Sequence, residues 1–172
     1  MKHLTDAVRR AVADSNWYAA LALSLALPDI CGRLERPAEG SKARYVSWCN
    51  TYLTPKYTHM IGPSREEHVF LHGEDCYALR CAVLHEGVDD IINQLARKTL
   101  DSFLFVAPRP GGGMIHCNQS NSKLQLQVDI FCEDICAGVD DWTQAVPPVN
   151  KDVRSAMALL MKIATLEGGL AF

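Results

Sequence analysis

The feature that most constrains the fold is a change in the spacing of apolar residues along the chain. From Leu4 to Leu53, apolar side chains recur at three- and four-residue intervals, as on the buried face of an α-helix. Between 103 and 130 the alternation has a period of two, which is typical of strands, and after Asn150 the helical spacing returns. The sequence therefore predicts a mainly α fold, a helical bundle with a small antiparallel β-hairpin or three-stranded sheet inserted at about residues 102–130.

Turn and capping residues divide this pattern into expected elements. One helix is expected over the segment from Leu4 to Leu27, bent or stopped by Pro28, and a loop over Tyr57 to Glu67. Further helices are expected from Ser41 or Lys42 to Pro55, from near Gly73 to Gly87, from Asp89 to Lys98, over 131–142, and from a capping Asn150 to Ile163. Strands are expected at 103–106, 114–117 and 124–130, the first two forming a hairpin.

Length and charge bound the class of protein. A chain of 172 residues predicts a single domain over residues 1–172, and 48% hydrophobic with 22% charged residues argues against a disordered chain. The uncharged run that ends at Pro28 is too short to span a bilayer, so no membrane partner is expected. A net charge of −3 excludes a general polyanion binder. Any nucleic-acid contact is therefore local, and the basic stretch Gly32 to Arg44 either faces phosphate or forms a solvated loop.

Seven cysteines, an odd number, occur without a secretion signal, which predicts free thiols and a cytoplasmic location. No Cys-x-x-Cys pair is present, so neither a zinc knuckle nor a thioredoxin-like redox site has its usual spacing.

The helix expected from Gly73 to Gly87 carries the residues with the clearest chemistry. Arg80 and His85 lie five positions apart among apolar neighbours. Five steps of an α-helix turn about 140° and rise about 7.5 Å, so the side chains leave adjacent flanks, and a long arginine can reach toward the imidazole. Histidine exchanges protons near neutrality, and arginine presents a charged fork to phosphate oxygens. The pair predicts phosphodiester chemistry.

The Arg-x4-His spacing of Arg80 and His85 near a helix end, followed by Gly87, resembles the signature of HEPN domains. The resemblance implies a metal-independent endoribonuclease without a cofactor, in which a homodimer brings two arginines and two histidines into one composite cleft. His85 would then act as general base or acid for attack by a ribose 2′-hydroxyl, and Arg80 would neutralise the phosphate oxygens. Asp75, Glu86 and Tyr77 are the candidate supporting residues around this pair.

Other interpretations of the same residues stay open. Active members of that family often carry a polar residue directly after the arginine, where this chain has Cys81, so the main alternative is a catalytically silent module that binds RNA, a nucleotide or a protein partner. A purely structural alternative gives Arg80 a salt bridge, gives His85 a place at the negative helix end, and makes Tyr77, Cys81 and His85 a packing stripe. A zinc site is a further alternative, on the spacing of His68, His72 and Cys76.

Overall fold

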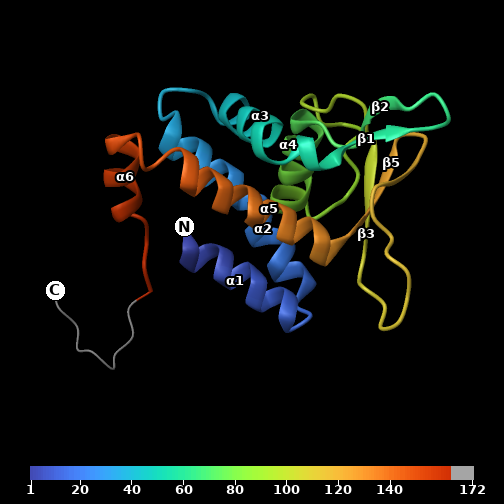
Figure 1. Ribbon diagram of the computed structural model, residues 1–172, viewed down its shortest axis with the longest axis horizontal. Helices are drawn as coiled ribbons and strands as arrows, with labels where there is room; N and C mark the ends of the chain where they lie inside the picture. Colours follow the sequence, from blue (N-terminus) through green and yellow to red (C-terminus); the bar gives the residue numbers. More distant parts are fainter. Residues whose placement is uncertain (164–172) are drawn as a thin grey trace.

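Helices form most of the structure, a computed structural model that describes residues 1–163 (Figure 1). The α-helices are α1 Lys2–Ala13, α2 Trp17–Glu35, α3 Ser41–Tyr52, α4 Gly73–Cys81, α5 Val128–Ala145 and α6 Lys151–Ala158. The strands are β1 Thr58–Ile61, β2 Glu66–Val69, β3 Ser102–Val106, β4 Asn118–Ser120 and β5 Lys123–Gln127. A mainly α fold with an inserted sheet is thus confirmed. That residues 1–172 form one domain stays a prediction, and 164–172 lie outside the described residues.

Helix α2 is the centre of the core and packs against α1, α3 and α5. Figure 1 shows α5 crossing the middle of the molecule, with α1 on one side, α3 on the other, the strands at one end and α6 at the opposite end. The largest fully buried side chains are aromatic or long and aliphatic, and they come from both the helices and the sheet: Trp142, Tyr45, Tyr57, Phe103, Phe131, Leu25, Leu27 and Leu53. Sheet and helices therefore share one hydrophobic core.

The first expected helix is two helices. The break falls between Ala13 and Trp17, where Ser15 has a φ of 56° and the Asn16 side chain accepts a hydrogen bond from the Ala19 amide at 3.4 Å. Asn16 is thus an N-cap that starts α2. Pro28 does not stop the helix, which runs on to Glu35, because tight packing in the core outweighs the single backbone hydrogen bond that a proline removes.

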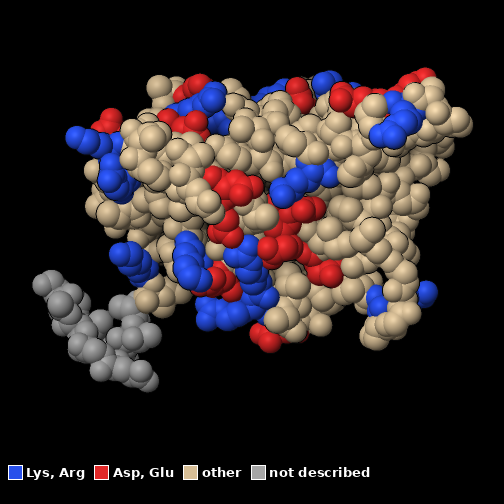
Figure 2. Space-filling view, viewed as in Figure 1, with Lys and Arg blue, Asp and Glu red and all other residues tan. Residues whose placement is uncertain are grey.

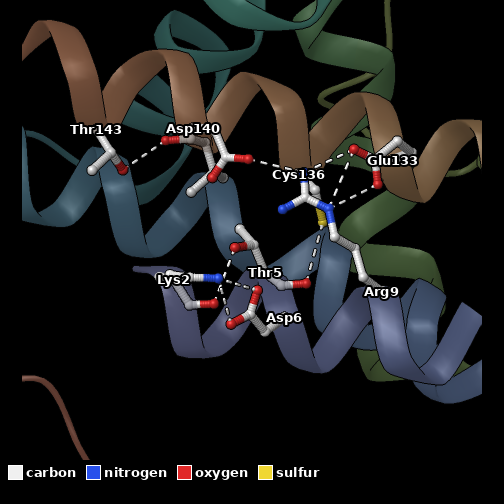
Figure 3. Close-up of polar contacts among 9 residues, drawn as sticks. Lys2, Thr5, Asp6, Arg9, Glu133, Cys136, Asp140 and Thr143 are labelled. Atoms are coloured by element: carbon white, nitrogen blue, oxygen red, sulfur yellow. Dashed lines mark hydrogen bonds and ion pairs between the residues drawn. The ribbon is translucent and has the colours of Figure 1, made fainter.

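Helix α1 is attached to α5 by charge as well as by packing (Figure 3). The Arg9 guanidinium donates to both oxygens of Glu133, at 3.0 Å and 2.8 Å, and to Asp140 at 2.9 Å. These acids belong to the stretch between 129 and 141 that contains five acids and no base. The hydrogen bond to the Glu133 carboxylate raises the pKa of Arg9 above its ordinary value. The acidic stretch is therefore a partner for α1 rather than a free anionic surface at these positions.

Two expectations for the middle of the chain are wrong. The segment from Tyr57 to Glu67, expected as a loop, contains the antiparallel hairpin of β1 and β2. The helix expected from Asp89 to Lys98 is absent, since this segment pairs with the edge of β3: the Ile91 amide donates to the Asp101 carbonyl at 2.8 Å, and the Phe103 amide donates to the Asp89 carbonyl at 2.9 Å. Backbone groups used in this pairing are not available to a helix.

The sheet is mixed, not antiparallel. Strand β5 lies between β3, to which it is parallel, and β4, to which it is antiparallel. The segment 114–117 is no strand, so the hairpin expected between it and 103–106 is wrong, and β5 ends at Gln127, where α5 begins. The parallel register sets Phe103 beside Leu124, and both are buried. The parallel pairing of β3 with β5 buries these side chains on one face of the sheet. The turn residues near these strands carry no information about which side chains become buried together, so they did not predict this pairing.

The last helix begins as expected and ends early. The Asn150 side chain accepts hydrogen bonds from the amides of Asp152 and Val153, which confirms it as the N-cap of α6. The helix ends at Ala158, short of the expected Ile163, whose side chain is exposed. In the described part of the chain, no helix is both long and apolar enough to cross a bilayer.

A glycine allows α3 and α4 to approach closely. A Cβ atom on Gly73 would lie 2.6 Å from Oδ1 of Asn50 and 2.8 Å from the carbonyl oxygen of Val46, both in α3. The same Asn50 oxygen accepts a hydrogen bond from the Gly73 amide at 3.1 Å. The absence of a side chain at this position therefore sets the distance between α3 and the start of α4.

Candidate functional site

The expected helix from Gly73 to Gly87 is present as α4 followed by a π-helical turn, Ala82–Glu86. Gly87 closes this turn with a φ of 72°, in the left-handed region that glycine adopts without strain. Hydrogen bonds in a π-helix join residues five apart, so the turn brings a side chain closer to the one five positions before it than a regular α-helix would. The local geometry thus favours contact between Arg80 and His85.

Arg80 and His85 do meet. Nη1 of Arg80 lies 3.1 Å from Nε2 of His85, a distance at which the guanidinium, which can only donate, is able to donate to the ring nitrogen. The imidazole of His85 is exposed, whereas only 18% of the Arg80 side chain is. The site therefore combines a fixed positive fork with a solvent-accessible titratable ring.

Asp29 fixes the other end of the Arg80 guanidinium. Its Oδ2 accepts from Nη2 of Arg80 at 3.2 Å, while its Oδ1 accepts from Nε of Arg44 at 3.1 Å and from the Ser41 hydroxyl at 3.4 Å. One carboxylate thus joins α2, α3 and α4 at a single point. Sequence reasoning missed Asp29 and Ser41; the available signal was a carboxylate directly after Pro28, on a helix that is otherwise apolar there.

The cluster carries a net positive charge. Two guanidinium groups, those of Arg44 and Arg80, face the single carboxylate of Asp29. Arg44 and Asp29 are mostly covered, with 15% and 20% of their side chains exposed, which strengthens their ion pair relative to one in bulk water. The arrangement can hold an anion beside an exposed imidazole, without a metal ligand set.

The three candidate supporting residues lie elsewhere. Asp75 is fully buried, and its carboxylate accepts from the backbone amides of Lys98, Thr99 and Leu100 rather than from Arg80 or His85. Tyr77 packs edge-on against Tyr45, with ring centroids 5.5 Å apart. The Glu86 carboxylate accepts a hydrogen bond from Nε2 of the Gln94 side chain at 2.7 Å. The contacts of these three side chains are therefore with α3 and with the loop that follows α4.

The residues of the alternative zinc site have separate partners. Nε2 of His68 lies 2.9 Å from Oε1 of Gln119, Nδ1 of His72 faces the Lys98 ammonium at 3.4 Å, and Cys76 is buried beside the Tyr45 hydroxyl. Over residues 1–163, no three His, Cys, Asp or Glu side chains are placed to share a metal ion. The spacing by four therefore does not translate into a metal centre within this range.

A second polar cluster lies between the first hairpin and α5. The buried Tyr57 hydroxyl donates to Asp134 at 3.1 Å, and Nε2 of His116 lies 3.9 Å from the same carboxylate oxygen. Nδ1 of His116 is buried without a hydrogen-bond partner among the described residues. Burial lowers the pKa of His116 and raises the pKa values of Asp134 and Tyr57. Only 11% of the His116 side chain is exposed, so the imidazole and the Asp134 carboxylate face each other largely out of contact with solvent.

Charged side chains of both signs are interleaved on the face seen in Figure 2, where basic and acidic groups lie next to one another along the middle and lower left. That face offers no continuous basic track of the kind that long-range attraction to a polyanion requires. Comparisons of the chain with known protein families, with curated proteins and with solved structures found no match.

Proposed function

We propose that this protein is a HEPN-like, metal-independent endoribonuclease that cleaves RNA at a site formed by Arg80 and His85. The observation that carries the proposal is the 3.1 Å contact between Nη1 of Arg80 and Nε2 of His85, with the imidazole exposed and the guanidinium held by Asp29. A proton-exchanging ring beside a fixed cation can supply acid–base help and charge stabilisation for in-line cleavage by a ribose 2′-hydroxyl.

The cleavage step begins when an RNA phosphate takes the place of the imidazole as acceptor for Nη1 of Arg80. Nε2 of His85 is then free to accept the proton of the adjacent 2′-hydroxyl. The 2′-oxygen attacks phosphorus, the bond to the 5′-oxygen breaks, and that leaving oxygen takes a proton from a protonated second copy of His85 in the proposed homodimer. The products are a 2′,3′-cyclic phosphate and a 5′-hydroxyl. Proton transfer of this kind contributes about 10² to 10⁴ in rate.

The test is incubation of the purified protein with a mixed-sequence RNA in the presence of a metal chelator. Cleavage to 2′,3′-cyclic phosphate ends is expected for the wild type and for the controls His3→Ala and Arg154→Ala, which change exposed residues outside the cluster. Activity is expected to fall at least 10²-fold in His85→Ala and in Arg80→Ala. Cleavage that persists in His85→Ala would show that another group performs the chemistry.

A second candidate is a module that binds RNA, a nucleotide or a protein partner without cleaving it. The ion pair between Arg80 and Asp29 favours it, since a paired guanidinium has less charge to offer a transition state, and the neighbouring Cys81 lends only a weak contact, with its sulfur 4.0 Å from Nη1. RNA that raises the melting temperature and is recovered intact would select this candidate, because a ligand of the folded state stabilises it.

A further inference from the structure

The cluster contains a second arginine whose role the proposed function does not use. Arg44 is the last residue of the basic stretch Gly32 to Arg44 and lies in the first turn of α3. It donates to the Asp29 carboxylate, which also accepts from Arg80. Two arginines far apart in the sequence therefore share one anchor. Such an arrangement fixes the spacing between two guanidinium groups before any ligand arrives.

The hydrogen bonds of Arg44 leave part of its fork free. Nε donates to Asp29 and Nη1 donates to the Glu39 carbonyl oxygen at 3.0 Å. Among the described residues, Nη2 has no hydrogen-bond partner, and it is not among the fully buried atoms without one, so it keeps some contact with solvent although only 15% of the side chain is exposed. An outer N–H edge of a fixed guanidinium is a good donor for a phosphate oxygen.

A single carboxylate does not cancel both arginines. Asp29 already accepts from Arg44, Arg80 and Ser41. Its single negative charge balances only one of the two arginines, so a net positive charge remains among these side chains of α2, α3 and α4. An RNA strand carries one phosphate on every nucleotide and can therefore contact both arginines at once. A mononucleotide has a single phosphate, so it cannot place a separate phosphate against each of the two arginines.

We propose that Arg44 is a second phosphate-binding residue of the Arg80 and His85 site, and that Asp29 is the positioning residue that holds the two arginines for neighbouring phosphates of a single RNA strand. This inference rests on the proposed function for its choice of ligand. It adds a binding residue that the Arg-x4-His spacing does not contain, and it assigns a role to Arg44, the last residue of the basic stretch.

The experiment measures binding of a short single-stranded RNA, 2′-O-methylated throughout so that it cannot be cleaved, to the wild type at a series of KCl concentrations. Each phosphate contact with a single strand contributes about 0.7 to the slope of log affinity against log salt. The variants Arg44→Gln and Arg80→Gln are each expected to lower that slope by about 0.7 and the affinity by about tenfold. Arg44→Lys, which keeps the charge, is expected to keep the slope.

The matched control is Arg36→Gln. Arg36 belongs to the same basic stretch but pairs with Glu35 and Glu39, outside the Asp29 cluster. The Arg36→Gln protein is therefore expected to bind the RNA with the same affinity and the same salt dependence as the wild type. A melting temperature recorded for each variant identifies any loss of fold, and the glutamine amide of Arg44→Gln can still donate to Asp29. The comparison between the lysine and glutamine variants separates lost charge from lost structure.

The outcomes distinguish this inference from the proposed function. An unchanged slope in Arg44→Gln overturns the inference, even if unmodified RNA is cleaved and His85→Ala abolishes cleavage. A reduced slope without any cleavage of unmodified RNA supports the inference for binding and contradicts the nuclease. RNA that does not bind at low salt contradicts both.

Discussion

At the scale of single residues, Asp75 shows how a buried charge organises a segment without regular structure. Its carboxylate is fully buried in the first turn of α4 and accepts hydrogen bonds from three consecutive backbone amides, those of Lys98, Thr99 and Leu100, and from the Thr99 hydroxyl. These bonds satisfy the charge and fasten the end of the loop before β3 to the helix. Asp75 is thus a structural residue, close in sequence to the site but separate from it.

We expect Asp75→Asn to lower the free energy of unfolding by about 2–3 kcal/mol. The amide has one acceptor oxygen in place of two, and its NH2 group would face amides that also donate. Urea unfolding followed by tryptophan fluorescence measures the change. Asp90→Asn is the control, since Asp90 is exposed and accepts a hydrogen bond from the Ile92 amide, and the cost of this substitution is expected to stay below about 1 kcal/mol. Equal costs for the two variants would contradict the role given to Asp75.

The buried cluster of Tyr57, His116 and Asp134 predicts a dependence of stability on pH. Burial lowers the pKa of His116 below its ordinary value of 6.5, while Asp134 and Asp129 oppose the shift and His59 adds to it. As the pH falls through 6.5, the unfolded chain binds a proton that the folded chain does not, so stability is lost. Asp134, whose pKa is raised by burial, acts in the opposite sense at lower pH, toward its ordinary 3.8.

His116→Gln isolates the first of these contributions. Between about pH 7 and about pH 5, we expect the wild type to lose stability relative to His116→Gln, because only the wild type carries the buried imidazole. The readout is the difference in unfolding free energy across the pH series, with His3→Gln, on the exposed side of α1, treated in the same way. A constant difference between wild type and His116→Gln would mean that His116 is not shielded from protons in the folded state.

At the scale of elements, the spacing of α3 and α4 decides whether Arg44 and Arg80 reach the same carboxylate. Gly73 sets that spacing because a Cβ would lie 2.6 Å from the Asn50 side chain and 2.8 Å from the Val46 carbonyl. The second distance is to backbone, which cannot rotate away. A larger residue at 73 therefore moves one helix relative to the other.

We expect Gly73→Ala to cost about 1–3 kcal/mol of stability. Because the shift separates the two arginines, RNA affinity is also expected to fall. Gly40→Ala is the matched control: Gly40 precedes α3 with an ordinary negative φ of −65°, and nothing lies within 4 Å of a Cβ placed there. Melting temperatures of the two variants provide the measurement, and a control as unstable as Gly73→Ala would contradict the argument from close approach.

At the scale of the whole molecule, the proposed nuclease needs a homodimer that gathers two copies of the Arg80 and His85 pair. We expect sedimentation velocity to give twice the mass of one chain. We also expect added His85→Ala protein to lower the activity of the wild-type protein, since a mixed dimer has only one of the two histidines that the proposed cleavage step uses. Wild-type activity that stays unchanged after mixing would mean that each chain carries its own complete site.

Much of the helical architecture was predictable from the sequence, while most pairing in the sheet was not. The helix 41–52, the limits of the segment 73–87 and the cap at Asn150 depend on spacing and capping within a few residues, which is local information. The break before Asn16, the β1 and β2 hairpin and the parallel pairing of β3 with β5 depend on which surfaces become buried together. The glycines at 111–113 predicted a hairpin, but β3 instead pairs with β5, an arrangement that buries Phe103 and Leu124 in the core.

The sequence by itself determined that an arginine and a histidine stand five residues apart on one helix, which placed a cation near a titratable ring. Only the tertiary structure decided what surrounds them, because Asp29 and Arg80 are 51 residues apart and a charge finds its partner through packing rather than through sequence distance. The π-helical turn, the close approach at Gly73 and the shared Asp29 carboxylate together bring Arg80, His85 and Arg44 into one cluster.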